Sequence, residues 1–423
     1  MLGKVSSLRS LIAVILGATA LVASPASQAQ QALKLNQEFQ FGGPAGTVPL
    51  AGNLLYNNQQ IFGAAYAGGQ IFANGVNLGG VDLGAIFQYA ASGTSPRSPT
   101  PLYAFSGPDG AHPNGSLVAD AQGNLYGTTQ VGGANNLGTV FKLARPIAGG
   151  TWTLTTLHSF AGPDGANPGA GVTIGPNGAL YGTTMTGGPP STATGVVFTL
   201  GTSGTMFRVV TPLYPGVGSR SSLIFDPQGN MFGTTYRTAA ARAAGSLFEI
   251  TPSGTYSAVA QFQYSEAFSG TSTANPIGNI VRDTAGNIYG MLGTVQTIMA
   301  YAPVATGAGV YKVTAATHQL VILSILTNQT AQSGVTRDAA GNLYGTTANG
   351  GSTGTGSVFT LNPAGALTTL ASLTSANLAP AGGVILDPTG KLWGTSSAGG
   401  NLSCSSGSNV TPTGCGTLFS LSP

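Results

Sequence analysis

The chain has few charged residues for its length. Only 6% of its 423 residues are Asp, Glu, Lys or Arg, and the formal net charge is +3. Proteins that bind nucleic acids normally present a basic stripe or patch, so this composition argues against a nucleic-acid partner. After residue 30 no apolar run is long enough to cross a bilayer, so we expect no membrane span in the mature protein.

Side chains typical of metal and covalent chemistry are also scarce. The three histidines, His112, His158 and His318, do not have the His-x-His or H-E-x-x-H spacing of a zinc site. The G-x-S-x-G signature of a nucleophilic serine is absent. We therefore expect no metal, no cofactor and no catalytic residues, although the sequence leaves enzymatic activity open.

Cysteine occurs only twice, as Cys404 and Cys415, on either side of an insertion near the end of the chain. In an exported protein two such thiols favour a disulfide, which here would close a ten-residue loop. The loop-entropy model gives a crosslink of this size about 2–3 kcal/mol of stabilisation. A metal site would need further soft ligands, and none is close in the sequence.

The first 29 residues have the pattern of a secretory signal peptide. Lys4 and Arg9 give a basic start, Leu11–Val22 is apolar, and Ser27–Ala29 offers a small–x–small cleavage site. A membrane anchor is the alternative, but the apolar stretch is short for a bilayer span. We expect residues 1–29 to be removed, leaving residues 30–423 as one domain in the periplasm or outside the cell.

In contrast, a glycine-rich signature recurs seven times along the chain. It reads G-N-L-Y-G-T-T or a close relative, and the spacing between copies is 49 to 64 residues. Periods near this range suit the four-stranded blades of a β-propeller. The glycine that follows the aromatic residue lies at positions 63, 127, 182, 233, 290, 345 and 394.

Each unit divides into four short β-prone runs separated by Gly, Pro, Asn and Asp, with no sustained helical period. The turn between the first and second runs usually reads D-x-x-G. Aspartate bonds its own backbone two residues on and glycine accepts positive φ, so the pattern predicts a tight hairpin. It also predicts a structural role for the turn aspartates, which are Asp120, Asp226, Asp283, Asp338 and Asp387.

The phase of the repeat predicts how a ring would close. The exported chain begins with an outer-type strand, Leu33–Phe41, and ends with a third-type strand, Gly416–Leu421. If Leu33–Phe41 completes the last blade, no sheet edge is left open. We therefore predict an all-β fold, a seven-bladed β-propeller of four-stranded antiparallel blades closed by an N-terminal strand. Small residues four positions before the turn Asp are expected near the axis.

Three motifs extend across most units: L-x-x-F-x-G-x-D-G-x-x-P, D-x-x-G-N-x-Y-G-T-T-x-x-G-G and G-T-V-F-K-L. They are clearest at Leu102–Leu143, Leu157–Leu200 and Asp338–Leu361, and weaker at 33–89 and in the fifth unit. With these motifs the chain resembles the GloVer tandem-repeat family of exported bacterial proteins. The resemblance implies a β-propeller and supplies no catalytic residues. With only Trp152 and Trp393, the chain lacks the tryptophan-rich repeats of quinone-dependent propellers.

The longest and most varied connections, among them Gln296–Ala308, are expected on one face of the ring. Loops on a rigid scaffold are where binding residues usually lie. The acidic candidates Asp109 and Asp164 occupy G-P-D-G turns, where a purely structural role is the alternative. They lie in adjacent blades, too far apart for the carboxylate pair of a glycosidase. The predicted ligand-binding residues are Asp109, His112, Asp164, Asn167, Tyr236, Arg237 and Arg242.

These observations favour a monomeric, non-catalytic binding propeller at the cell envelope or outside the cell, which recognises a glycan or a protein. A structural component of a surface or matrix is one alternative. A polysaccharide lyase or hydrolase is another, and it would place its chemistry on the same loops.

Overall fold

The computed structural model describes residues 33–41, 48–49, 54–67, 72–73, 76–77, 83–92, 99–147, 149–189, 194–213, 218–236, 243–263, 270–299, 302–331, 333–374, 380, 382–399 and 416–422. The predicted signal peptide and the pair Cys404 and Cys415 lie outside these residues. Within the described residues there is no helix long and apolar enough to cross a membrane.

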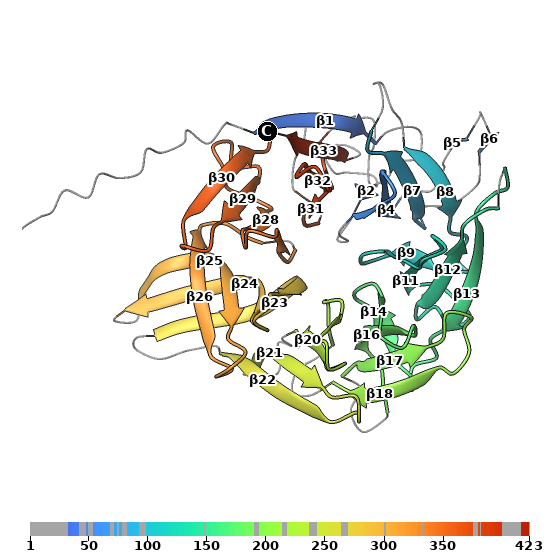
Figure 1. Cartoon of the computed structure of the whole chain (residues 1–423), viewed down its shortest axis with the longest axis horizontal. Coiled ribbons are helices and arrows are strands. Elements are labelled where there is room, and N and C mark those ends of the chain that lie inside the picture. The colour runs from blue at the N-terminus through green and yellow to red at the C-terminus, as the bar shows by residue number, and fades with distance from the viewer. Residues whose placement is uncertain are drawn as a thin grey trace, which may run out of the picture. The chain divides into compact units, whose positions relative to one another are not determined.

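Residues 33–423 form one unit, a ring of seven antiparallel sheets around a central axis (Figure 1). In each blade we call the strands A to D from the axis outward. In the first three blades strand A consists of two short pieces that both pair with strand B. The seven-bladed propeller predicted from the repeat is confirmed.

The strands of blades 1 to 4 are β2 (Val48–Pro49), β3 (Leu55–Asn57), β4 (Gln60–Ala67), β7 (Ala85–Ala90) and β8 (Thr100–Ala104); β9 (Ala111–Pro113), β10 (Val118–Ala119), β11 (Leu125–Val131), β12 (Thr139–Ala144) and β13 (Thr153–Ser159); β14 (Ala166–Pro168), β15 (Thr173–Ile174), β16 (Leu180–Thr186), β17 (Val196–Leu200) and β18 (Arg208–Pro212); and β19 (Ile224–Phe225), β20 (Met231–Thr235), β21 (Ala243–Ile250) and β22 (Tyr256–Gln263). A small hairpin, β5 (Phe72–Ala73) and β6 (Val76–Asn77), lies between β4 and β7 in the chain.

The strands of blades 5 to 7 are β23 (Gly270–Arg282), β24 (Ile288–Met299), β25 (Ala302–Val313) and β26 (Leu320–Thr327); β27 (Thr336–Arg337), β28 (Leu343–Thr347), β29 (Ser357–Leu361) and β30 (Leu367–Ser372); and β31 (Ile385–Leu386), β32 (Leu392–Ser396), β33 (Thr417–Ser422) and β1 (Lys34–Gln40). In blade 5, β24 and β25 pair from Ile288 to Met299. The interpretation of Gln296–Ala308 as a loop is therefore wrong for most of its length, because the strands continue through it.

The signature glycine is required by the aromatic ring of strand C. In blade 2, a Cβ on Gly127 would lie 2.6 Å from the ring of Phe141, which covers the glycine. The same contact with an aromatic side chain recurs in every blade, at 2.3 to 2.6 Å, and in blade 5 the contacting atom is the Tyr311 hydroxyl oxygen. The glycine of G-N-L-Y-G-T-T and the aromatic of G-T-V-F-K-L are thus two halves of one packing unit, since a core has no spare volume for even one methyl group.

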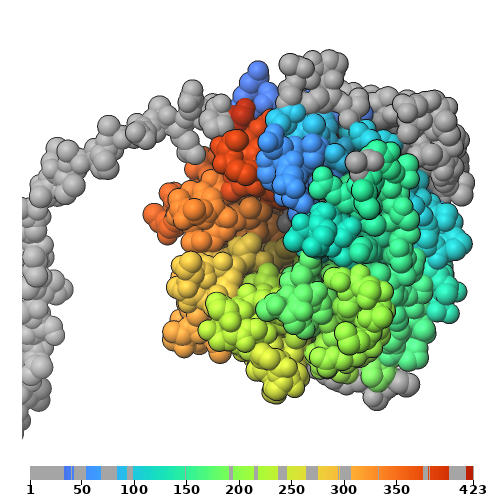
Figure 2. All heavy atoms as spheres, turned by 45° about the vertical axis from the view of Figure 1, so that its right-hand side comes forward, coloured from blue at the N-terminus to red at the C-terminus, as the bar shows by residue number. Residues whose placement is uncertain are grey.

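The two signature hydroxyls serve different contacts. The first, as in Thr128, donates to the carbonyl of Ala170 in the next blade at 2.8 Å. The second, as in Thr129, bonds Thr139 of strand C in its own blade at 2.8 Å. In the blades that keep both hydroxyls, adjacent residues thus fasten strand B to strand C and one blade to the next, whereas blades 1 and 5 have Ala64–Ala65 and Met291–Leu292 at these positions. Figure 2 shows side chains filling the space between blades that ribbons leave open.

The inner strands crowd together at the axis, as the small residues predict. A Cβ on Gly334 would lie 1.7 Å from the carbonyl oxygen of Asn279. Asn279 has the one larger side chain at the position of the repeat that lies four residues before the turn Asp, where the other blades have Gly or Ser. Its amide donates to Ser116 Oγ at 3.1 Å and accepts from the Ser222 backbone N–H at 3.1 Å. Ser116 is in blade 2 and Asn279 in blade 5, so this bond crosses the axis.

The ring closes through β1, as predicted. β1 pairs antiparallel with β33 as the outer strand of blade 7. Its Glu38 accepts from Lys391 Nζ at 2.7 Å and Ser420 Oγ at 2.6 Å in blade 7, and from Tyr89 OH in blade 1 at 3.1 Å. The buried Phe41 that follows β1 packs in a cluster shared by blades 1 and 7. The closing seam is therefore packed like the other interfaces.

Candidate functional site

The predicted binding residues belong to one face of the ring. We call this the upper face; it carries the D–A and B–C connections, while the lower face carries the A–B and C–D turns. Arg237 and Arg242 lie outside the described residues. The other five lie on blades 2, 3 and 4: Asp109, His112, Asp164, Asn167 and Tyr236.

Asp109 and Asp164 occupy equivalent turns and hold them closed. Asp109 accepts from the Ser106 N–H at 2.8 Å and from Tyr103 OH at 2.5 Å. Burial, together with the bond to Asp109, raises the pKa of Tyr103 above its usual range. Asp164 accepts from the Ala161 N–H at 2.8 Å and contacts His158 Nε2 at 2.8 Å. Both carboxylates are thus occupied by their own turn and a side chain of the preceding strand D.

His112 and Asn167 are a second equivalent pair, each just before the proline of strand A. Both have positive φ, 54° and 52°. The His112 ring stacks on Tyr66 with centroids 4.5 Å apart, and its Nδ1 lies 2.9 Å from the Tyr66 carbonyl oxygen. Because a carbonyl can only accept, Nδ1 carries the proton, which leaves Nε2 with the lone pair when the ring is neutral.

A chain of hydrogen bonds connects these residues across three blades. Tyr66 OH donates to Gln130 Oε1 at 3.0 Å. Asn167 Nδ2 donates to the Gln130 carbonyl at 3.1 Å, and Thr186 Oγ1 donates to Asn167 Oδ1 at 2.9 Å. The polar side chains are therefore held in fixed orientations while their remaining surface faces solvent, which lowers the entropy cost of binding a ligand.

Tyr236 continues the same line into blade 4. The guanidinium of Arg220 lies 4.5 Å from the centre of its ring, within cation–π range. The Tyr236 N–H donates to Gly218 O at 3.0 Å, and the backbone of Met185 in blade 3 lies against Gly218. Arg220 is exposed and forms no ion pair with any carboxylate in the part of the chain that the structure describes.

We call this set the upper band. Every member is at least partly exposed, and the set combines two tyrosines, an imidazole, two amides, a thioether and one cation. It contains no carboxylate. Its members are Tyr66, His112, Gln130, Asn167, Met185, Arg220 and Tyr236.

Four of these residues were not predicted from the sequence. Three of them, and Tyr236, occupy the third position after the signature glycine. That position holds Tyr66, Gln130, Met185 and Tyr236 in blades 1 to 4, but only Gly293, Ala348 and Ser397 in blades 5 to 7. This contrast is visible in the sequence, whereas Arg220 has no such signal. Among the described residues, no three His, Cys, Asp or Glu side chains cluster as metal ligands.

Comparisons with known proteins support the fold and the repeat. No curated protein matches the chain. An ulvan lyase, a polysaccharide lyase, superposes with a TM-score of 0.53 at 10% identity, over 90% of this chain and 95% of its own. The extracellular domain described as part of a hybrid two-component system of B. thetaiotaomicron gives 0.52 at 12% identity over 91% of this chain.

The match spans only 39% of the solved chain of that extracellular domain. At such identities both likenesses show the propeller fold alone. The family model, in contrast, matches the sequence from the end of strand C in blade 2 to strand B in blade 5. Residues 146–297 match the family model described as the Gloeobacter/Verrucomicrobia repeat, which supports the resemblance seen in the motifs.

Proposed function

We propose that the protein is an exported, non-catalytic propeller that binds a glycan on the upper band. The observation that carries this proposal is the run of large side chains on blades 1 to 4, joined by hydrogen bonds where blades 5 to 7 have only Gly, Ala and Ser. Sugars combine apolar C–H faces with many hydroxyls, so they suit a surface that alternates aromatic rings with amides.

The nearby carboxylates support binding over hydrolysis. Asp109 and Asp164 each hold a turn and a neighbouring side chain, so neither is poised as a general acid or nucleophile. Export through a signal peptide would place the upper band in contact with envelope or environmental polysaccharides.

One feature favours a lyase as a second candidate. The bond from Nδ1 of His112 to the Tyr66 carbonyl fixes the tautomer in which Nε2 is basic, as a general base requires. A lyase acting there would produce unsaturated sugars from a uronate polysaccharide, and substitution of His112 would abolish that product beyond its effect on binding.

The test is a polysaccharide and glycan array probed with the protein and with Tyr236→Ala and His112→Ala. We expect each substitution to weaken binding about tenfold or more, because each removes an aromatic plane. Met206→Ala, which removes an exposed side chain on the lower face, is the matched control.

Folded protein that binds no glycan would contradict the proposal, as would binding that both substitutions leave unchanged. Ultraviolet absorbance of unsaturated products on the bound polysaccharides would instead identify the lyase.

A further inference from the structure

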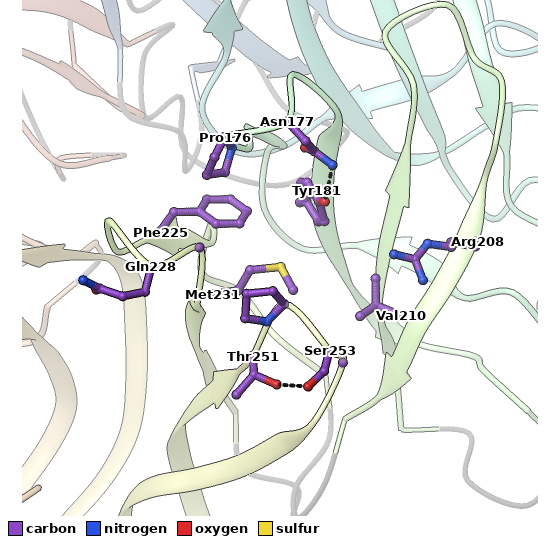
Figure 3. A pocket seen from close by; sticks show the side chains of 13 residues that line it. Pro176, Asn177, Tyr181, Arg208, Val210, Phe225, Gln228, Met231, Thr251 and Ser253 are labelled. Carbon is purple, nitrogen blue, oxygen red and sulfur yellow. Dashed lines mark hydrogen bonds between the residues drawn. The ribbon is translucent and has the colours of Figure 1, made fainter.

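The lower face carries a hollow between blades 3 and 4, lined by residues of both blades (Figure 3). None of the lining residues belongs to the upper band. The volume of the hollow is about 450 Å³, within the range of small-molecule sites. The A–B turns of both blades, strand D of blade 3 and the C–D turn of blade 4 surround it. We call it the lower hollow.

The lower hollow arises where the repeat departs from its own pattern. Gly175 stands at the position of the turn aspartate. A Cβ there would lie 2.5 Å from the ring of Tyr181 and 3.1 Å from that of Phe225, so the two rings exclude any side chain. Their centroids are 5.2 Å apart, edge to face. Two aromatic rings thus form the inner wall in place of a carboxylate.

The outer wall is also lowered at this interface. In the same place between blades 1 and 2, Trp152 packs edge-on against Phe62 with centroids 6.1 Å apart. Strand registers place Gly254 of blade 4 where blade 2 has Trp152, because Phe141 pairs with Thr156 and Phe248 with Ala258. No atom lies within 4 Å of a Cβ built on Gly254. The space that an indole fills in one interface stays open in the other.

The polar groups of the lower hollow have unused capacity. Asn177 Nδ2 donates to Tyr181 OH at 2.9 Å, so the hydroxyl keeps its own proton to donate. Ser253 and Thr251 share a hydroxyl bond of 2.7 Å on the opposite side. Arg208 is exposed, and no carboxylate of the described residues forms an ion pair with it. No acidic residue lines the hollow.

We propose that the lower hollow binds a uronic acid residue. A guanidinium pairs with one carboxylate through two parallel hydrogen bonds. Hydroxyl and amide groups suit the hydroxyls of a sugar ring, and the walls of Tyr181, Phe225 and Met231 suit its apolar face. A single cation with no lining carboxylate selects an acidic sugar over a neutral one.

The test measures binding of the methyl glycosides of glucuronate and galacturonate, with methyl glucoside as the neutral probe, by ligand-observed NMR titration. We expect a uronate to bind and the glucoside to bind about tenfold more weakly or not at all. Arg208→Gln and Tyr181→Phe should each weaken uronate binding about tenfold, as expected for the loss of a charged or buried hydrogen-bonding partner. Arg145→Gln, which removes a cation from the lower face of blade 2, should leave it unchanged.

Ser253→Trp adds bulk at an exposed turn position of the rim and should block the hollow without disturbing the core. Tyr236→Ala on the upper band should have no effect, which separates this proposal from the function proposed above. Equal affinity for glucoside and uronates, absence of uronate binding, or binding indifferent to both Arg208→Gln and Tyr181→Phe would overturn the proposal.

Discussion

At the residue scale, the turn aspartate, the asparagine four residues later and the aromatic six residues later are linked by hydrogen bonds to one carboxylate. In blade 2 the Asp120 carboxylate accepts from the N–H groups of Gln122 and Asn124, at 3.0 and 2.9 Å. It also accepts from Asn124 Nδ2 at 2.7 Å and from Tyr126 OH at 2.9 Å. One carboxylate therefore closes the hairpin and fixes the buried aromatic. In blade 7 the equivalent carboxylate, that of Asp387, accepts from Trp393 Nε1 at 2.9 Å.

These bonds predict acid sensitivity. Partial burial raises the pKa of Asp120, Asp283, Asp338 and Asp387, but the hydrogen bonds outweigh it and hold each pKa below its usual value. The unfolded chain then binds more protons near the ordinary aspartate pKa of about 3.9. The stabilisation is therefore complete above about pH 4 to 5 and is lost as the pH falls through the folded pKa values.

Urea unfolding midpoints between pH 7 and pH 3 measure this effect. We expect the midpoint to fall steeply below about pH 4, and Asp338→Asn to be less stable at pH 7 but less sensitive to acid. An acid dependence identical in Asp338→Asn and the unaltered protein would show that these turns do not carry it.

At the element scale, the closing strand β1 depends on a departure from the repeat. In four of the turns the residue four positions after the aspartate is Asn, but after Asp387 this residue is Lys391. Its ammonium reaches Glu38 of β1 and lies 4.1 Å above the Trp393 ring. The carboxylate side chain is only 9% exposed, so its partners replace water almost completely. Lys391, which replaces the Asn of the other turns, thus supplies the charged partner of Glu38 on the N-terminal strand.

A double-mutant cycle on Glu38→Gln and Lys391→Asn tests this dependence. Glu38→Gln should lower the free energy of unfolding by about 2–3 kcal/mol, because the partly buried Lys391 ammonium loses its charged partner. The double substitution should cost less than the sum of the single ones, since Lys391→Asn restores the repeat's own residue. Additive effects in chemical denaturation would mean that the two charges do not act together.

At the scale of the whole molecule, the ring is held at its centre by one side chain. Asn279 bonds blades 2 and 4 from blade 5, while the other inner strands touch through glycine and serine. Contacts between neighbours fix the circumference of the ring but leave it able to flatten, and a bond across the axis restrains that distortion.

Asn279→Ala removes both bonds together. We expect the free energy of unfolding to fall by about 2 kcal/mol, as for the loss of two buried hydrogen bonds. Glycan binding on the upper band should persist, because none of its members contacts Asn279. An unchanged denaturation midpoint would show that the axis is held by the glycine and serine contacts instead.

The fold was predictable because the contacts that build it repeat. The signature glycine and the aromatic of the third strand recur in every unit, and the small residues at the axis recur at a fixed offset from the turn, so these positions are visible without coordinates. The structure shows that the glycine and the aromatic pack on each other. The phase of the repeat was enough to assign β1 to the last blade. The strands of blade 5 were underestimated because Gly, Pro and Ala between residues 293 and 308 have low strand propensity, and hydrogen bonding between β24 and β25 overrides it.

The sites were less predictable because they depend on exceptions to the repeat. Asp109 and Asp164 attract attention in the sequence, yet their oxygens are occupied by Tyr103 and His158. Gly175 and Phe225, which create the lower hollow, do not stand out in the sequence as binding residues. Only the structure shows that they meet across a blade interface.

The bond between Asn279 and Ser116 has one more consequence. The bond joins blade 2 to blade 5 across the axis, so it divides the passage through the ring at the level of the inner strands. The two proposed sites lie on opposite faces of the ring, and the bond stands between those faces. A long chain that engages both would have to wrap around the outer edge, or two chains would have to meet on one molecule. With both proposed sites occupied, one molecule would hold polysaccharide on two opposite faces.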